Sequence, residues 1–458
     1  MNIYLHLEVL NRELDSKLLL ATIAASRGHE VIVSDQESII KGLTRKFLSP
    51  GIFHTKSLTP GKLKILKHQQ IINTGCKITS IDEEGGLIDY GYDKFAKLRY
   101  SNKTLKQASA VFTWGPEDYK TLKKIYPSQS KKIYKTGSPR ADLWQPFFFD
   151  YWENKDQKDL KRPFLLVSSN FGGVLNMKSL NKRIIALRQG GYFDRDPKMF
   201  KRVIKDEAEK LKMIGLFVEA LKYIADKNKN YNVILRPHPV ENIDLWKTLL
   251  NGIKNIKVIR DDSISLWVKN SFAVMHNGCT TALEATISQK PVISYMPFEA
   301  SFTRELANDL GFKVTTIKKL SYKIEKIFKS SKKKKLKKIV KTLPPTLLKK
   351  IYIDEKEYAA LKMIKIWETL NNNKKLSKSN NWFVFMCSLK IMKFNGILGR
   401  FFKKIFYKNF HLKQNHKFSY LNERKIMKKI ARLQKILGIK QKLSYKILSD
   451  KTLLIKQK

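Results

Sequence analysis

Alternation between short apolar strands and amphipathic helices is the feature of this sequence that most constrains its fold. Near the start of the chain, strands are expected at Ile3 to Val9 and Glu30 to Ser34, with a helix between them from Leu14 to Ser26. Such a strand–helix–strand unit forms a parallel sheet, because the helix carries the chain back to the starting edge. Further strands are predicted at 77–81, 110–114 and 132–135, and a helix at 116–125.

A polar and aromatic stretch from Gln145 to Arg162 interrupts this pattern, and the alternation then begins again. Strands are predicted at 163–168, 232–236, 256–259, 272–276 and 291–295, with helices at 206–225 and 281–288. We therefore predict an α/β fold with two Rossmann-like domains facing a cleft, at 1–150 and 151–330. Ligands of such sheets bind beyond the carboxyl ends of the strands, so the loops that follow strands are candidate sites.

After residue 330 the alternation stops and the composition changes. Closing helices are predicted over 331–370, followed by a basic, aromatic, helical C-terminal extension over 371–458. The last 128 residues hold 35 of the 90 basic residues and only 6 of the 40 acidic ones. The formal net charge of +50 for the whole chain predicts acidic partners: nucleic acid, anionic lipid or a phosphorylated substrate.

The cysteines and the N-terminal residues indicate that the protein resides in the cytosol. The three cysteines, at positions 76, 279 and 387, are far apart and form no CxxC pair. They indicate neither a disulfide framework nor a zinc site, and a reducing cytosol is expected. The first residues lack the features of a signal peptide, and no run of about 18 apolar residues predicts a spanning helix. Neither a metal site nor a cofactor is predicted.

The motif Arg236-Pro237-His238-Pro239 follows a predicted strand and is the first candidate ligand site. The two prolines fix the backbone and end the pairing of the strand, which would hold Arg236 and His238 at its carboxyl end. A guanidinium offers parallel donors to phosphate oxygens, and an imidazole can donate to phosphate in either protonation state. A turn that contains a packed histidine explains the same residues.

The second candidate is the segment HNGCTTALEA, in which a predicted strand ends, Asn277 begins a turn and a helix follows. The free N–H groups at such a helix start suit a phosphate. Hydroxyl groups of Thr280 and Thr281 add donors, and Glu284 could reach a pair of ribose hydroxyls. Alternatively, Thr281 and Glu284 have the spacing of a capping box and serve only to begin the helix.

The third candidate is the acidic loop Asp82-Glu83-Glu84-Gly85-Gly86, which follows a strand of the first half. Adjacent carboxylates could include a general base, because their mutual repulsion raises the pKa of one of them. A solvated acidic turn is the simpler explanation.

Five further residues lie in loops where a ligand could bind. Ser168 and Ser169 end the first strand of the second half, where they would face the cleft or cap a helix. Arg140, in the segment GSPRAD, could face the cleft or belong to a plain turn. Arg12 and Glu13 follow the first strand and could contact an acceptor or cap the next helix.

Taken in order, these segments resemble a family of bacterial surface carbohydrate (polysaccharide) biosynthesis proteins. The resemblance runs from about Ile3 to Tyr295 and rests on RELD, GHEVIVSD, DEEG, FTWG, GSPRAD, RPHP and HNGCTTALEA, of which the last two in combination are the most specific. Those proteins are GT-B-like and are related to CMP-sugar (sialyl- and Kdo-type) transferases and to the transferases that polymerise capsule and teichoic acid. The resemblance implies a metal-independent, inverting glycosyltransferase of capsule or lipopolysaccharide biosynthesis.

The resemblance also implies roles for particular residues. The first domain would bind a lipid-linked or glycan acceptor, with Glu83 as the general base and Glu84 supporting it. The second domain would bind the nucleotide-sugar, with a CMP-sugar favoured. There His238 would contact the donor phosphate, and Thr280 and Thr281 would hold it.

Basic residues alternate with phenylalanine and tryptophan from Asn380 to Phe410. This mixture suits interfacial helices, whose aromatic side chains lie in the headgroup layer and whose basic groups contact anionic lipid. We expect the extension to bind an anionic membrane surface, and the chain to be cytoplasmic and peripheral on the inner face of the cytoplasmic membrane. A disordered basic tail or a helical appendage packed on the body are the alternatives.

Three other functions stay open. A UDP-sugar 2-epimerase has the same two-domain architecture, although its soluble substrates would not need a basic aromatic tail. A CDP-glycerol-type polyol-phosphate transferase uses a cytidine nucleotide and a lipid-linked acceptor. Charge alone would also suit a nucleic-acid-binding protein, but the extension contains no recognised nucleic-acid motif, so no nucleic acid is expected as a partner.

Overall fold

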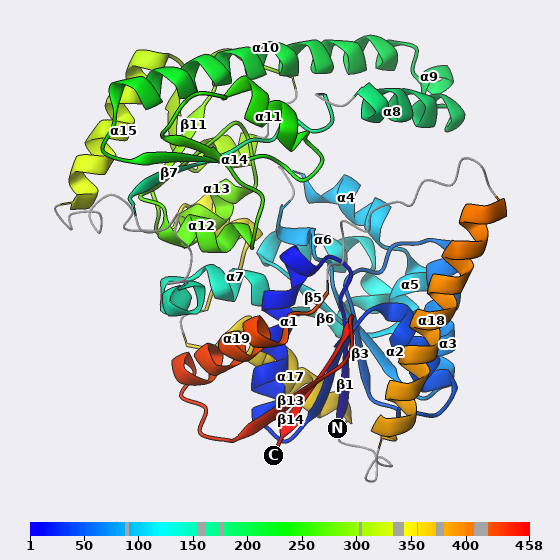
Figure 1. The fold of residues 1–458 in the computed structure, drawn as a ribbon. Helices are drawn as coiled ribbons and strands as arrows, with labels where there is room; N and C mark the ends of the chain where they lie inside the picture. Colours follow the sequence, from blue (N-terminus) through cyan, green and yellow to red (C-terminus); the bar gives the residue numbers. More distant parts are fainter. Residues whose placement is uncertain are drawn as a thin grey trace. The chain divides into compact units, whose positions relative to one another are not determined.

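Two parallel sheets, each in its own compact unit, organise the chain (Figure 1). Unit 1 comprises Met1–Leu143 with Leu348–Lys458, and unit 2 comprises Trp144–Leu347. The predicted α/β fold with two Rossmann-like sheets is confirmed. The computed structural model describes residues 1–87, 91–153, 162–174, 177–301, 305–332, 343–354, 356–371, 380–406 and 420–458.

Six parallel strands form the body of the sheet in unit 1, in the order β2-β1-β3-β4-β5-β6. They are β1 (Asn2–His6), β2 (Glu30–Ser34), β3 (Ile52–Thr55), β4 (Lys77–Ile81), β5 (Ala108–Thr113) and β6 (Ile133–Lys135). The sequence predicts β2 and β4 at these bounds but misses β3, a four-residue strand that contains a buried histidine, His54. Because β2 and β3 lie on opposite sides of β1, the connections change direction there, and this is where sheets of this type bind ligands.

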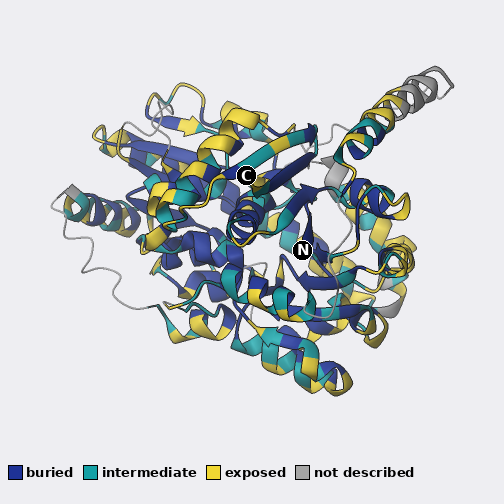
Figure 2. Cartoon of the chain, turned by 90° about the horizontal axis from the view of Figure 1, so that it is seen from below, coloured by how far each residue is buried: buried dark blue, intermediate teal, exposed yellow. Residues whose placement is uncertain are grey.

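Helices cover both faces of this sheet. On one face α1 (Leu10–Ser26) contacts α17 (Ala359–Asn371) and α19 (Glu423–Ile436). The other face is a core of buried apolar side chains that includes Ile39, Leu122 and Phe385. The helices that contribute to it are α2 (Gln36–Thr44), α3 (Lys62–Asn73), α4 (Tyr92–Arg99), α5 (Asn102–Gln107), α6 (Pro116–Ile125) and α18 (Trp382–Phe406). Figure 2 shows the strands almost wholly buried between these layers.

The end of the chain is part of unit 1. The hairpin of β13 (Leu443–Ser449) and β14 (Thr452–Gln457) extends the sheet, with β14 antiparallel to β2. Leu453 and Ile455 of β14 are fully buried, and Ser34 bonds Thr452 through their hydroxyl groups. The sequence predicts a separate helical extension over 371–458, whereas in the structure 420–458 are part of the first domain. This hairpin gives β2 a partner and so covers an edge that would otherwise expose unpaired N–H and C=O groups.

Unit 2 has the strand order β9-β8-β7-β10-β11-β12, all parallel. The strands are β7 (Phe164–Ser168), β8 (Asn232–Arg236), β9 (Ile256–Val258), β10 (Ala273–His276), β11 (Val292–Tyr295) and β12 (Phe312–Val314). The connections reverse direction between β7 and β10, as in dinucleotide-binding sheets of strand order 3-2-1-4-5-6. The helices are α8 (Met177–Gln189), α9 (Tyr192–Arg195), α10 (Lys198–Lys227), α11 (Ile243–Leu249), α12 (Ile264–Asn270), α13 (Thr281–Ile287), α14 (Glu305–Asp309) and α15 (Ile317–Lys332).

Short segments connect the body of unit 1 to its returning chain. The side chain of Asp142, in α7 (Pro139–Trp144), accepts hydrogen bonds from the N–H groups of Ala359 and Ala360, at 3.1 and 2.9 Å, and so caps α17. Later in α17, Trp367 donates to the Thr79 hydroxyl at 3.0 Å. The remaining short helices are η1 (Gly85–Leu87), η2 (Pro127–Lys132), η3 (Pro146–Trp152) and α16 (Pro345–Lys350).

None of the helices in the described parts of the chain is both long enough and apolar enough to cross a bilayer.

The hairpin makes a prediction about stability. Ile455→Ala should lower the free energy of unfolding by about 2–4 kcal/mol, because it leaves a cavity between β14 and the helices that cover it. Lys446→Ala, at an exposed position of β13, is the matched control and should change the free energy by less than about 0.5 kcal/mol. Urea denaturation followed by circular dichroism measures both. Equal effects of the two substitutions would show that the hairpin contributes nothing to the core.

Candidate functional site

The first candidate site lies in unit 2, where the connections of the sheet reverse direction. Ser168 ends β7 and His276 ends β10, and the two residues are paired in the sheet register. The loops that follow are bonded to each other: the Asn170 N–H donates to the side-chain oxygen of Asn277 at 2.8 Å, and the Asn170 amide donates to the Gly278 carbonyl at 3.1 Å. The structure thus brings together residues 168–170 and 276–281, which are more than 100 positions apart in sequence.

His276 holds the turn that begins the second of these loops. Its Nδ1 atom accepts hydrogen bonds from the N–H groups of Gly278 and Cys279, at 2.9 and 3.3 Å. Burial lowers the pKa of His276 to about 3, so the ring is neutral at physiological pH. Because Nδ1 accepts, the ring proton lies on Nε2. Gly278 has a φ of 85°, a left-handed conformation that suits glycine and explains the Asn-Gly pair.

Three of the four hydroxyl groups predicted for this site have different environments. The Thr281 hydroxyl is buried and bonds the Ser168 hydroxyl at 3.1 Å, while Ser168 also donates to the Cys279 sulfur at 3.3 Å. Thr280 is half-buried and is the N-cap residue of α13, but its side chain makes no capping hydrogen bond. The alternative of a capping box between Thr281 and Glu284 is not realised, because Thr280 and not Thr281 is the N-cap. The Thr280 hydroxyl, which caps nothing, is available to a ligand.

Arg236, at the end of β8, holds neighbouring loop backbone in place and does not point into a ligand site. The Arg236 guanidinium donates to the carbonyl groups of Arg260, Asp261 and Asp262 and stacks over Trp267. This side chain is buried, and burial lowers its pKa to about 10. The predicted phosphate donor is thus committed to the protein backbone, whereas His238, two residues later, is half-buried beside the site.

Sequence reasoning missed Glu241, which connects two loops of this site. Its buried carboxylate accepts hydrogen bonds from the Ser169 hydroxyl at 2.7 Å, the Phe171 N–H at 2.8 Å and the Trp246 indole at 2.8 Å. Ser169 is therefore a structural partner of Glu241. An acidic residue three positions after His238, directly before the N-cap Asn242, was the signal in the sequence.

Two buried donors remain for a ligand at this site. In the described part of the chain, the Asn277 amide nitrogen and His276 Nε2 are buried and have no hydrogen-bond partner. Leaving such donors unpaired costs roughly 1–3 kcal/mol each, a cost that a bound oxygen atom would remove. Glu284, the predicted ribose contact, is buried one turn into α13, and its charge acts on Lys269 of α12.

The second candidate site lies in unit 1, in the acidic loop after β4. Each of its three carboxylates contacts a basic side chain: Asp82 contacts Arg99, Glu83 contacts Lys17, and Glu84 contacts Arg12, at distances of 2.8, 2.8 and 3.2 Å. Arg140 donates to the Glu83 carbonyl at 2.9 Å and lies 4.0 Å from its carboxylate. The structure therefore brings together Arg12, Arg140, Glu83 and Glu84, which come from three separate segments of the sequence.

The two glutamates of the loop differ in access. Glu83 and Lys17 form an ion pair whose side chains are 4% and 1% exposed, whereas the Glu84 side chain is 48% exposed. Glu84 is thus the carboxylate that a substrate can reach without rearrangement, and Glu83 fixes the loop to α1. Glu13 does not reach the loop, since its carboxylate accepts from the N–H groups of Glu8 and Val9 and organises the start of α1.

Trp114 explains why two glycines follow the acidic residues. A Cβ atom on Gly86 would lie 2.3 Å from the Trp114 ring, and one on Gly85 would lie 2.9 Å from it. The indole N–H of Trp114 donates to the Asp82 carbonyl at 2.7 Å. The tryptophan of the FTWG segment thus supports the acidic loop from below.

Comparisons with known proteins bear on the fold. No protein-family profile and no curated protein sequence matches this chain. A crystal structure assigned as a UDP-N-acetylglucosamine 2-epimerase from Listeria monocytogenes matches with a TM-score of 0.50 and 12% identity, over 82% of this chain and 98% of that one. MnaA from S. aureus with UDP matches with a TM-score of 0.43 and 13% identity, over 82% and 100% of the two chains. UDP-GlcNAc 2-epimerase from Neisseria meningitidis with UDP-GlcNAc matches with a TM-score of 0.43 and 12% identity, over 81% and 100%.

The likeness to the Listeria protein extends along nearly the whole of that chain. It shows that this chain has the same GT-B-like α/β fold, built from two Rossmann-like sheets.

The buried neutral histidine predicts a dependence of stability on pH. Unfolded His276 has a pKa near 6.5 and folded His276 one of about 3, so the unfolded state binds more protons between these values. The contribution of His276 to stability is therefore present above pH 6.5 and is lost as the pH falls toward 3. His276→Gln removes this contribution. The difference in unfolding free energy between wild type and variant should therefore shrink by up to about 1.4 kcal/mol for each pH unit by which the pH falls below 6.5. Urea denaturation at pH 7, 6 and 5 measures this, and a constant difference would contradict a buried neutral ring.

Proposed function

We propose that this chain is an enzyme that binds a nucleotide-sugar, and that unit 2 holds the phosphates of the nucleotide. The observation that carries the proposal is the set of donors gathered where β7 and β10 end: the Asn277 amide, His276 Nε2 and the Thr280 hydroxyl. Open parallel sheets bind their ligands at the point where the connections reverse. Neutral donors, held rigidly by hydrogen bonds between the two loops, would stabilise the negative charge of a departing phosphate.

The reaction that we propose is epimerisation of a UDP-sugar. The sequence favoured a different reaction, glycosyl transfer from a CMP-sugar. The support is the likeness to the Listeria protein, whose assigned activity is that of a UDP-N-acetylglucosamine 2-epimerase. For a 2-epimerase, a base must remove the C2 proton while the electron pair of that bond expels the nucleotide diphosphate from C1. An acid must then return a proton to the opposite face of C2 as the bond from C1 to the diphosphate forms again, so both steps require acid–base groups. Unit 1 supplies candidates in Glu84, which solvent reaches, and in Glu83, which Lys17 holds in place.

Transfer from a nucleotide-sugar is the second candidate, favoured by the resemblance of the acidic loop and RPHP to motifs of CMP-sugar transferases. In this reaction Glu84 or Glu83 would remove the proton of an acceptor hydroxyl. The acceptor would be a glycan or a lipid-linked sugar at the inner face of the cytoplasmic membrane. A CDP-glycerol-type transferase would use the same phosphate site.

Nucleotide binding and deuterium incorporation test the two reactions. A thermal-shift screen of the purified chain against UDP, CMP, CDP, GDP and ADP should show selective stabilisation by a uridine nucleotide, since a ligand that binds only the folded state raises Tm. With UDP-GlcNAc in D2O, an epimerase should place deuterium at C2 of the product, detected by NMR. Stabilisation by CMP without deuterium exchange would favour the transferase. No stabilisation by any nucleotide would contradict the phosphate site.

Thr280 provides a sharper test of the phosphate site. Thr280→Val removes a hydroxyl that makes no capping hydrogen bond, so it should weaken nucleotide binding about 5- to 10-fold with little change in Tm of the free protein. Thr248→Val, at an exposed position of α11 in the same unit, is the matched control and should leave affinity unchanged. Isothermal titration calorimetry measures both, and equal affinities would remove Thr280 from the site.

A further inference from the structure

Helix α18 is fixed to unit 1 by its first turns. Asn381 caps it, through a hydrogen bond from the Val384 N–H to the Asn381 side chain at 3.1 Å, and Asn381 itself donates to the Phe47 carbonyl. Phe385 and Leu389 are buried in the core cluster that also holds Leu48. A Cβ atom on Gly42 of α2 would lie 2.6 Å from the Phe385 ring, so the two helices are in close contact. The orientation of α18 about its axis is therefore set by packing.

The opposite side of α18 exposes large apolar side chains. Phe383, Phe394 and Ile397 are 72%, 61% and 48% exposed, and Lys390 among them is also exposed. At about 100° per residue, these four side chains lie within an arc of about 60°, turned away from Phe385 and Leu389. Figure 2 shows exposed residues along the described part of this helix. Solvation of two phenylalanines and an isoleucine in one row is unfavourable, which indicates a partner.

A groove continues this surface onto the C-terminal hairpin. It has a volume of about 490 Å³ and lies between the start of α18 and the β13–β14 hairpin. Its lining is mostly apolar but includes two lysines; the residues are Trp382, Phe383, Met386, Ser444, Tyr445, Lys446, Leu448, Leu454 and Lys456. Lys393 of α18 pairs with Asp450 in the hairpin turn at 2.6 Å and lies over the ring of Tyr420, a further exposed aromatic residue. Helix and hairpin thus form one surface.

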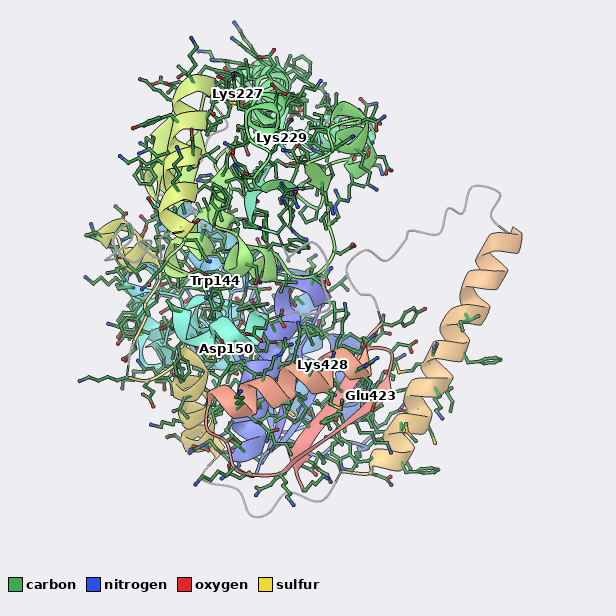
Figure 3. The ribbon with its side chains drawn as sticks, turned by 60° about the vertical axis from the view of Figure 1, so that its left-hand side comes forward. Trp144, Asp150, Lys227, Lys229, Glu423 and Lys428 are labelled. Atoms are coloured by element: carbon green, nitrogen blue, oxygen red, sulfur yellow. The ribbon has the colours of Figure 1, made fainter. Side chains whose placement is uncertain are left out.

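The charge of this region indicates the partner. The 25 residues of α18 include five basic residues and no acidic one. Helix α19, on which Figure 3 labels Glu423 and Lys428, packs on α1 at the other face of the sheet and is not part of this surface. An apolar row flanked by basic groups matches an anionic bilayer, whose headgroups attract lysine and whose acyl boundary accepts phenylalanine and isoleucine. A nucleic acid would satisfy the lysines but would leave the aliphatic side chains in water.

We propose that the docking surface of this chain for an anionic phospholipid bilayer is the outward face of α18 together with the groove beside β13. This surface is smaller than the basic extension of 371–458 expected from the sequence, because α19 packs on α1 and β14 pairs with β2. The inference does not depend on the nucleotide-sugar proposal. It assigns Phe383 and Phe394 as the residues that enter the bilayer interface, with Lys390 contacting headgroups.

Sedimentation with lipid vesicles tests the docking surface on the full chain. Wild type should sediment with phosphatidylglycerol vesicles much more than with phosphatidylcholine vesicles, and added salt should weaken this binding. The double variant Phe383→Glu with Phe394→Glu should bind phosphatidylglycerol vesicles at least about tenfold more weakly, since each exposed phenylalanine loses its apolar contact. Leu66→Glu with Phe200→Glu replaces exposed apolar residues of α3 and α10 and is the matched control, which should bind as wild type does.

Several results would overturn this proposal. These are no sedimentation of wild type with anionic vesicles, equal sedimentation of wild type with both kinds of vesicle, or undiminished binding by the double variant. A dimer in solution that the double variant converts to a monomer would show instead that this face binds a second copy of the chain. Both variants change exposed side chains, so unchanged circular dichroism and Tm should accompany the loss of binding.

Discussion

Parallel pairing of the strands is the constraint on which the rest of this structure depends. A parallel strand can be followed by another only if the chain returns along the outside of the sheet, so every strand brings a crossover helix. All the strands of unit 2 therefore end at one edge, and their loops meet there. The hydrogen bonds between the loops of Ser168 and His276 exist because β7 and β10 are neighbours in register, although the connections leave them in opposite directions. The candidate phosphate site follows from this topology.

Buried charged side chains in both units are held by ion pairs or by hydrogen bonds to the backbone. In unit 1, Glu83 of the acidic loop pairs with Lys17 of α1, and Asp82 accepts two hydrogen bonds from Arg99. Removing one partner of such a buried pair leaves an uncompensated charge, so these contacts fix the loop in one conformation. In unit 2, the Arg236 guanidinium donates to backbone carbonyl groups instead, so it holds the loop and is not free to bind a ligand. The surrounding structure decides whether a charged residue near a site binds substrate or supports the protein.

The C-terminal hairpin has two roles in unit 1. It supplies the antiparallel strand that pairs with β2, and it provides one wall of the groove beside α18. An ion pair between Lys393 of α18 and Asp450 of the hairpin turn connects the two elements. A surface of this kind, made of segments that complete the sheet, would couple membrane docking to the integrity of the domain that carries the acidic loop.

The sequence by itself determined the α/β class, the division into two Rossmann-like sheets and the bounds of β2, β4, β8 and α6, because these elements have strong periodicity and clear terminal residues. It also identified the loops in which Asn277, Thr280 and Glu84 lie, since candidate ligand loops follow strands. Only the tertiary structure decided which of those side chains remain available: it committed Arg236 to carbonyl groups, buried Glu83 against Lys17 and revealed Glu241. The structure also placed the hairpin of 443–457, which the sequence assigned to a basic helical extension, at the edge of the first sheet. The physical reason is the same in each case. Hydrogen-bond partners and strand neighbours come from residues that are distant in the chain, and a local sequence pattern carries no information about them.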